Sequence, residues 1–172
     1  MSEIKSTLDL IMERTKDLTL SDDEKREIEQ KEERERLRGL IQRSMDGTLA
    51  PAEFDRELTA AIEKDPDFTK DALRTETIER LDPDQDNDRL LDILDQYVGV
   101  RKDVCTEKLD RFRSRAAAER KRREEPLRDG LAAAGIRGNA VIPNIGKDPQ
   151  WQSWYAEADD QLKRELRLIR GS

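Results

Sequence analysis

The chain contains no histidine and a single cysteine, Cys105, among its 172 residues. Histidine is the commonest general base and metal ligand, so its absence removes the most frequent kinds of catalytic and metal site. One cysteine cannot form an internal disulfide, nor can it supply the thiolates of a usual zinc site. Cys105 is either a small buried apolar residue or a reactive thiol. We therefore expect no enzyme activity, no metal and no cofactor.

Long apolar runs and nucleotide-binding motifs are also missing. Nowhere do 18 apolar residues follow one another, so no membrane-spanning helix and no membrane association is expected. The first residues, M-S-E-I-K-S-T, lack the apolar core of a signal peptide. Glycine-rich phosphate-binding motifs and the nucleophile motif G-x-S-x-G do not occur. These features predict a soluble protein of the reducing cytoplasm.

Charge is abundant and nearly balanced. Charged residues make up 42% of the chain and hydrophobic residues 34%, with a net charge of −7. Interleaved acids and bases are typical of exposed helix surfaces, and a thin core favours elongated helices or an oligomer. The distribution is uneven: residues 1–100 carry 16 Lys/Arg against 28 Asp/Glu, a net of −12, whereas residues 101–172 carry 17 against 12, a net of +5. One end of the molecule is therefore expected to be basic.

The pattern of apolar residues predicts one long helix over 88–125, about 38 residues and roughly 55 Å long. Its main stripe has gaps of three, four or seven residues, as a helix face requires, and consists of Leu91, Leu94, Val98, Cys105, Leu109 and Phe112. No large apolar residue follows Phe112 before Pro126, so the stretch 111–125 is predicted to project as a charged helical arm. The expected fold is a single all-α domain, 1–172: an elongated helical bundle around this long helix.

Shorter helices are predicted around the long one. The segment 3–16 has an amphipathic pattern, with Ile4, Leu8, Ile11 and Met12 on one face. Ser21 and Glu24 form a capping box for a helix that ends at Asp46-Gly47. Later helices begin at a proline, namely Pro51, Pro66 and Pro149.

One segment does not fit a helix. Residues 136–147 form an irregular apolar loop in which glycine, asparagine and proline interrupt apolar residues. Because such a loop is costly in water, it is predicted to lie against protein and to pack with the aromatic residues that follow it. This structural cluster would be the densest packing unit of the protein, and its members are Ile136, Val141, Ile142, Ile145, Trp151, Trp154 and Tyr155.

Two segments of the sequence carry a resemblance. M-S-E-I-K-S-T-L-D-L at the start, and G-I-R-G-N-A-V-I-P-N followed by D-P-Q-W near the end, resemble a family of uncharacterised bacterial proteins. The likeness covers about a third of the chain and is loose in the middle. It implies a bacterial, soluble, helical protein, and no activity is attached to the family.

A basic run is the main candidate interaction site. Its residues are Arg111, Arg113, Arg115, Arg120, Lys121, Arg122 and Arg123. Such density suits nucleic acid or an anionic surface, although the overall acidity and the neighbouring glutamates weigh against this function. Two acidic stretches, from Asp46 to Glu53 and from Asp84 to Asp95, match a calcium loop only in part, and helix capping explains them more simply.

The preferred hypothesis is a non-enzymatic interaction or scaffold protein. The long helix and the segment 3–16 together offer more apolar face than so thin a core needs, which favours a homo-oligomer, most simply a dimer, or an unidentified protein partner. The alternative hypothesis is a nucleic-acid or anionic-surface binding module that acts through the basic arm 111–123.

Overall fold

The computed structural model describes residues 21–138 and 141–169, and within these ranges it contains helices and no strand. The prediction of an all-α fold is confirmed. The predicted helix over 3–16 lies outside the described residues. The α-helices are α2 (Asp22–Met45), α3 (Pro51–Lys64), α4 (Pro66–Glu79), α5 (Asp88–Ile93), α6 (Lys102–Ala133) and α7 (Pro149–Arg167).

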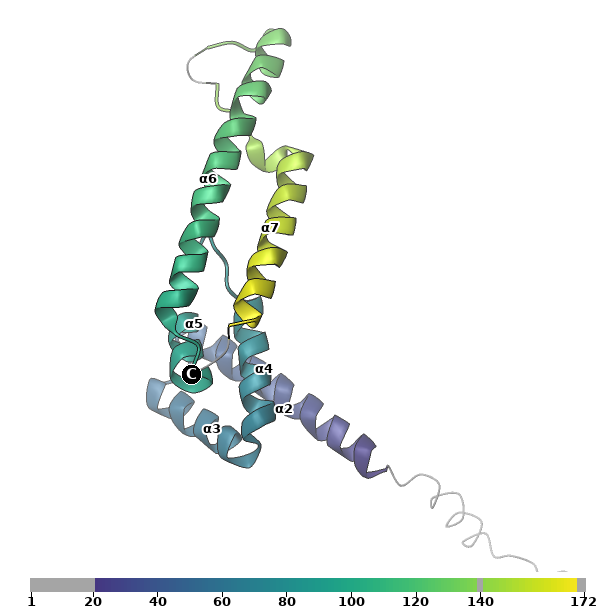
Figure 1. The fold of residues 1–172 in the computed structure, drawn as a ribbon, viewed down its shortest axis with the longest axis vertical. Coiled ribbons are helices and arrows are strands. Elements are labelled where there is room, and N and C mark those ends of the chain that lie inside the picture. Colours follow the sequence, from purple (N-terminus) through teal and green to yellow (C-terminus); the bar gives the residue numbers. More distant parts are fainter. Residues whose placement is uncertain (1–20, 139–140, 170–172) are drawn as a thin grey trace, which may run out of the picture.

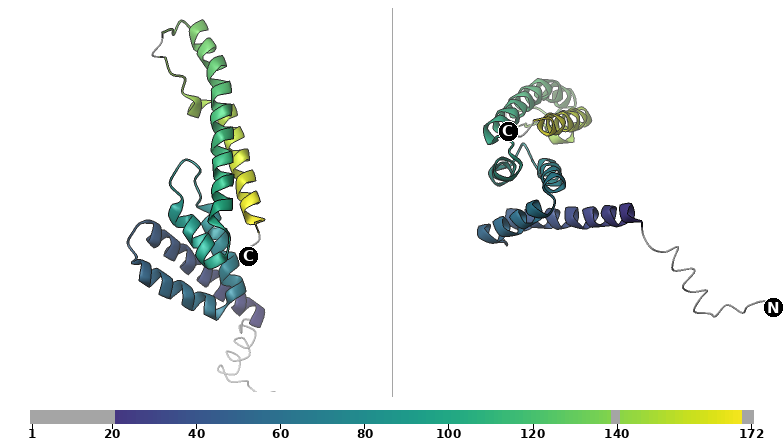
Figure 2. Two further views of the ribbon diagram at one scale, coloured as in Figure 1. Left: turned by 60° about the vertical axis from the view of Figure 1, so that its left-hand side comes forward. Right: turned by 60° about the horizontal axis from the view of Figure 1, so that its bottom comes forward.

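The molecule has two visibly different parts (Figure 1). The base consists of α2, α3, α4 and α5, and the hairpin consists of α6 and α7, which run side by side away from the base. Figure 2 shows the same division from two further directions, with the far end of α6 and the segment after it extending beyond α7. We call this far end, residues 126–149, the hairpin tip.

The helix starts follow the sequence signals. Ser21 accepts a hydrogen bond from the Glu24 amide (3.2 Å) while the Glu24 carboxylate accepts one from the Ser21 amide (2.7 Å), which is the predicted capping box. Asp65 caps α4 by accepting from the Phe68 amide at 3.2 Å. Proline occupies the first position of α3, α4 and α7, where its missing amide hydrogen costs nothing.

The predicted helix over 88–125 begins at Asp88 as expected, but it is interrupted, and its predicted end at 125 is wrong. α5 is followed by a π-helical turn, η1 (Leu94–Val98), and then by Gly99 with φ 78°, a left-handed conformation that glycine adopts readily. α6 starts afresh at Lys102 and continues through Pro126 to Ala133. Proline removes one backbone hydrogen bond, but the leucine, arginine and alanine residues on both sides are strong helix formers. The irregular segment therefore begins only after Ala133.

The base holds the tightest packing. Large side chains with no solvent exposure come from each of its longer helices: Leu37 and Ile41 from α2, Phe54 and Leu58 from α3, and Leu73 and Ile78 from α4. Phe54 meets Tyr97 edge to face, with ring centroids 5.9 Å apart, and the Arg89 guanidinium lies 4.9 Å from the centroid of the Phe54 ring. The densest core is thus here and not, as predicted, at the loop and tryptophans near the C-terminus.

A buried carboxylate ties α2 to α4 within the base. Glu76 is 6% exposed and receives two hydrogen bonds from Arg38, both of 3.0 Å, and one of 2.9 Å from Arg80. The hydrogen bonds from Arg38 hold the pKa of Glu76 below its usual value, against the opposing effect of burial. The negative charge of Glu76 is therefore buried together with the arginines that pair with it, Arg38 and Arg80.

The stretch 111–125 is paired with α7 and does not project alone. Phe112 and Ala116 are buried on the α7 side of α6, facing Ala158, Leu162 and other residues of α7. The Phe112 ring meets the Tyr155 ring edge to face, with centroids 5.3 Å apart. The Ala116 side chain is small, so α6 and α7 can pack closely at this level although no large apolar residue is present there.

Candidate functional site

The α6–α7 hairpin carries both candidate groups from the sequence, the basic run and the apolar loop. Near the base, Lys108 of α6 donates a hydrogen bond of 2.9 Å to Glu165 of α7, which lowers the pKa of that carboxyl. The Tyr155 hydroxyl donates to Asp84 at 2.8 Å, and burial together with this bond raises the pKa of Tyr155. The first contact joins the two helices of the hairpin, and the second fixes the hairpin to the loop between α4 and α5.

Two arginines of the basic run are used in holding the fold together. Arg113 donates to the Pro83 carbonyl at 2.7 Å and to the Gln85 carbonyl at 3.3 Å, so it fastens α6 to the loop that leads into α5. Arg123 donates to Glu119 at 2.6 Å and spans to α7, where it reaches Gln150 at 3.0 Å and Asp148 at 3.4 Å. Neither guanidinium is freely available to a phosphate.

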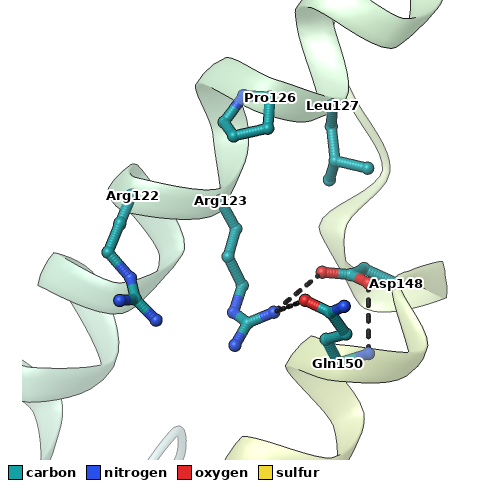
Figure 3. A pocket seen from close by; sticks show the side chains of 6 residues that line it. All are labelled: Arg122, Arg123, Pro126, Leu127, Asp148 and Gln150. Atoms are coloured by element: carbon teal, nitrogen blue, oxygen red, sulfur yellow. Dashed lines mark hydrogen bonds and ion pairs between the residues drawn. The ribbon is translucent and has the colours of Figure 1, made fainter.

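Figure 3 shows how Arg123 anchors the hairpin tip. Its guanidinium points from α6 toward the first turn of α7, where Asp148 also accepts from the Gln150 amide at 3.1 Å and so caps α7. Arg122 lies one residue away and points outward, and it pairs with Glu119 at 2.7 Å. Hydrogen bonds from Arg122 and Arg123 lower the pKa of Glu119. Arg123 therefore holds the start of α7 against α6.

The remaining basic residues do not share one helix face. Successive residues of an α-helix are about 100° apart, which places Arg111, Arg115 and Arg122 on one side of α6. Arg120 falls roughly on the opposite side, together with Arg113. Within the described residues, Arg115, Arg120 and Lys121 have no ion pair, whereas Arg111 pairs with Glu107 at 2.6 Å. The basic run is therefore not a continuous phosphate-binding stripe.

The predicted structural cluster is divided by the structure. Ile145 is 4% exposed, Val141 is half-buried, and the stacked rings of Trp151 and Trp154 lie 5.5 Å apart and pack partly against the core. Ile136 and Ile142, in contrast, are 53% and 82% exposed. The prediction that the whole loop lies against protein is wrong for these two residues. α7 begins only after this loop, so it does not cover them.

An apolar groove lies at the hairpin tip, and Ile142 directly precedes Pro143, one of its lining residues. Its volume is about 420 Å³, and it is lined mainly by Leu127, Leu131, Pro126, Pro143 and Pro149, with Gly130, Asn144, Lys147 and Asp148 completing it. A second hollow of about 440 Å³ adjoins it and shares Pro126, Leu127 and Asp148. We call the first hollow the tip groove. The sequence prediction missed it, although prolines on both sides of Leu127 and Leu131 were a signal that helix packing is interrupted there.

The acidic stretches considered for calcium have other partners. Asp88 and Asp92 both pair with Lys102, at 3.2 and 2.8 Å. Asp46 accepts from Gln42 at 2.9 Å in the turn that ends α2. In residues 21–138 and 141–169, no group of three or more Asp, Glu or Cys side chains lies close enough to hold a metal ion.

Cys105 is fully buried in the core, as the first of its two interpretations predicts. Burial, and secondarily the nearby Asp95 and Asp103, raises the pKa of its thiol to about 11. A thiol of this kind is protonated at neutral pH and is a poor nucleophile.

Comparisons with protein-family models, with curated proteins and with solved structures give no match to this chain. The family resemblance therefore stays a prediction. Among the described helices, none is both long enough and apolar enough to cross a membrane. The function has to be inferred from the surface itself.

Proposed function

We propose that the protein is a non-enzymatic scaffold that self-associates through its hairpin tip. The observation that carries this proposal is the tip groove, together with Ile142, which is 82% exposed and directly precedes the lining residue Pro143. Exposed apolar residues that occur singly need no explanation, whereas a groove with apolar neighbours marks a binding surface. A second copy of the chain is the occupant that the uneven charge favours, since the acidic base of one copy attracts the basic hairpin of another.

Sedimentation equilibrium of the full chain at tens of micromolar tests this proposal. We expect a dimer in low salt that persists in high salt, because apolar burial is not screened. Ile142→Glu should give a monomer, since it places a charge in the contact. The matched control is Leu168→Glu, at a residue that is 80% exposed but lies at the opposite end of α7. A monomeric wild-type chain, or equal effects of the two variants, would contradict the proposal.

A second candidate function is binding of nucleic acid or an anionic surface through the arm 111–123. It is favoured by Arg115, Arg120 and Lys121, which are exposed and have no ion pair within the described residues. Binding of a generic DNA duplex at low salt, with affinity that falls steeply as salt rises, would support it. The triple variant with alanine at these three positions should then lose binding, and no binding by the wild-type chain at low salt would exclude it.

A further inference from the structure

The tip groove has the shape and chemistry of a receptor for an amphipathic helix. Its walls are Leu127 and Leu131 on the last turns of α6 and prolines on the segment that leads into α7. Leucine and proline side chains offer no hydrogen bonds, so the occupant must present an apolar face to them, while Asn144, Lys147 and Asp148 add polar groups to the same groove. Grooves between a helix and an irregular segment are a recurrent way of binding such a face.

The chain itself supplies a segment of this kind. Residues 3–16 place Ile4, Leu8, Ile11 and Met12 within one narrow stripe of the predicted helix, and the other residues of the segment are polar except Leu10. A helix of this length is marginal alone and gains its stability by docking. The segment precedes α2, which begins at Asp22.

The segment cannot reach the tip groove of its own chain. Figure 1 shows the start of α2 and the hairpin tip at opposite ends of the long axis of the molecule. From Lys102 to Leu127, α6 alone rises about 38 Å at 1.5 Å per residue. The four residues 17–20 that join this segment to the base, even when fully extended, would span only about 14 Å. Residues 3–16 can therefore enter this groove only from a second chain.

The charge distribution favours an antiparallel arrangement of two chains. The first half of α2, residues 22–35, has eight acidic against four basic residues, and in Figures 1 and 2 it extends outward from the base. Residues 111–150 have ten basic against five acidic residues. Two antiparallel copies bring each acidic α2 toward the basic hairpin of the other, whereas a tip-to-tip contact would bring like charges together.

We propose that residues 3–16 of one copy dock in the tip groove of a second copy and that the exchange is reciprocal, which gives a two-fold symmetric dimer. The inference rests on the proposed self-association and names the surface that meets the tip. A reciprocal exchange contains two identical contacts and closes on itself, so it ends at the dimer.

The test uses full-length variants that each damage one side of the contact. Leu8→Glu disrupts the stripe, and Leu131→Glu disrupts the groove with a residue that is itself a good helix former. Because each substitution occurs twice in the two-fold dimer, each is expected to weaken the dimer by about a hundredfold or more, the effect of removing two buried leucines from the interface. Ile142→Glu, next to the lining residue Pro143, serves as a second tip variant, since its side chain is 82% exposed and contributes little to folding. The control is Leu10→Glu, about 200° around the predicted helix from Leu8.

Mixing the two variants provides the decisive measurement. Leu8→Glu retains an intact groove and Leu131→Glu retains an intact stripe, so an equimolar mixture should form a one-to-one dimer with one working contact although each variant alone is monomeric. Native mass spectrometry with one partner isotopically labelled identifies the mixed species. A tip-to-tip dimer predicts no such rescue, because both copies need an intact tip.

The outcomes separate this inference from the proposed function. If Ile142→Glu gives monomers while Leu8→Glu remains dimeric, self-association through the tip stands and the role of residues 3–16 is overturned. If the wild-type chain is monomeric at tens of micromolar, both are overturned, and a foreign helix becomes the occupant to seek. Equal weakening of the dimer by Leu10→Glu and Leu8→Glu would also overturn the inference, because the stripe would then not be the docking face.

Discussion

Leu73 in the base is 0% exposed, whereas Ile142 at the hairpin tip is 82% exposed, although both are large aliphatic residues. In the base, three helices converge around α4, so its buried side chains have neighbours on several sides. At the tip, the groove is lined by the end of α6, the irregular segment and Pro149, the first residue of α7, and Ile142 stays exposed. The same kind of residue therefore contributes to folding in one region and remains available for binding in the other.

Polar residues show the same contrast. Glu76 in the base is buried with three hydrogen bonds from two arginines. Arg122 at the tip side of α6 makes one surface ion pair, with a side chain that is 72% exposed. Buried pairs are costly to break, whereas exposed pairs contribute little. Stability should therefore be concentrated in the base, and the tip should tolerate substitution.

The largest expected effect comes from Phe54→Ala in the base. Phe54 is completely buried and packs against Tyr97 and Arg89, so its removal leaves a cavity and should lower the free energy of unfolding by about 3–5 kcal/mol. Leu131→Ala in the half-buried tip groove should cost less than about 1 kcal/mol, because little packing is removed. Urea unfolding followed by circular dichroism measures both. Similar losses would contradict the division between base and tip.

Glu76→Gln should have the next largest effect, a loss of about 1–3 kcal/mol at neutral pH. The matched control is Glu35→Gln, which removes an exposed partner of the same Arg38 and should change stability by less than about 0.5 kcal/mol.

The loss on Glu76→Gln should also depend on pH. Because the pKa of folded Glu76 is lowered from its ordinary value of 4.5, its contribution is present above that value and disappears as pH falls through the folded pKa. The difference in unfolding free energy between wild type and Glu76→Gln should therefore shrink below about pH 4.5. A difference that stays constant down to pH 3 would show that the carboxylate charge is not what Arg38 and Arg80 recognise.

Features set by neighbouring residues were predictable from the sequence. The capping box at Ser21, the proline starts of α3, α4 and α7, and the all-α fold depend on interactions within one or two helical turns. The break at Gly99 was missed because glycine inside an apolar stripe costs a helix only about 1 kcal/mol. In the structure, Gly99 takes the left-handed conformation, the Val100 amide donates to the Leu94 carbonyl at 2.9 Å, and Val100 is 0% exposed, so this helix end combines a local cap with packing that the sequence does not show.

The candidate site was less predictable than the fold, for the same reason. The sequence shows that basic residues are concentrated in the basic run. It does not show that Arg113 and Arg123 are engaged within the fold, because their hydrogen-bond partners lie 30 and 25 residues away in the sequence. The apolar loop was predicted to be covered because its composition is apolar. Its coverage depends on where α7 begins relative to the end of α6, and the hairpin leaves Ile136 and Ile142 beyond that point.

The smallest predicted effects compare two glycines, one at the junction between base and hairpin and one at the tip. Gly99 has φ 78°, a conformation that costs an alanine about 1–2 kcal/mol, so Gly99→Ala should destabilise the protein by that amount. Gly130 lies inside α6, and a methyl group there would meet nothing within 4 Å. Gly130→Ala should therefore stabilise the helix by about 0.4–1 kcal/mol, because alanine restricts the unfolded chain. The two unfolding midpoints should move in opposite directions. A shift of the same sign would mean either that α5 and α6 can join without the left-handed turn, or that the end of α6 unfolds independently of the base.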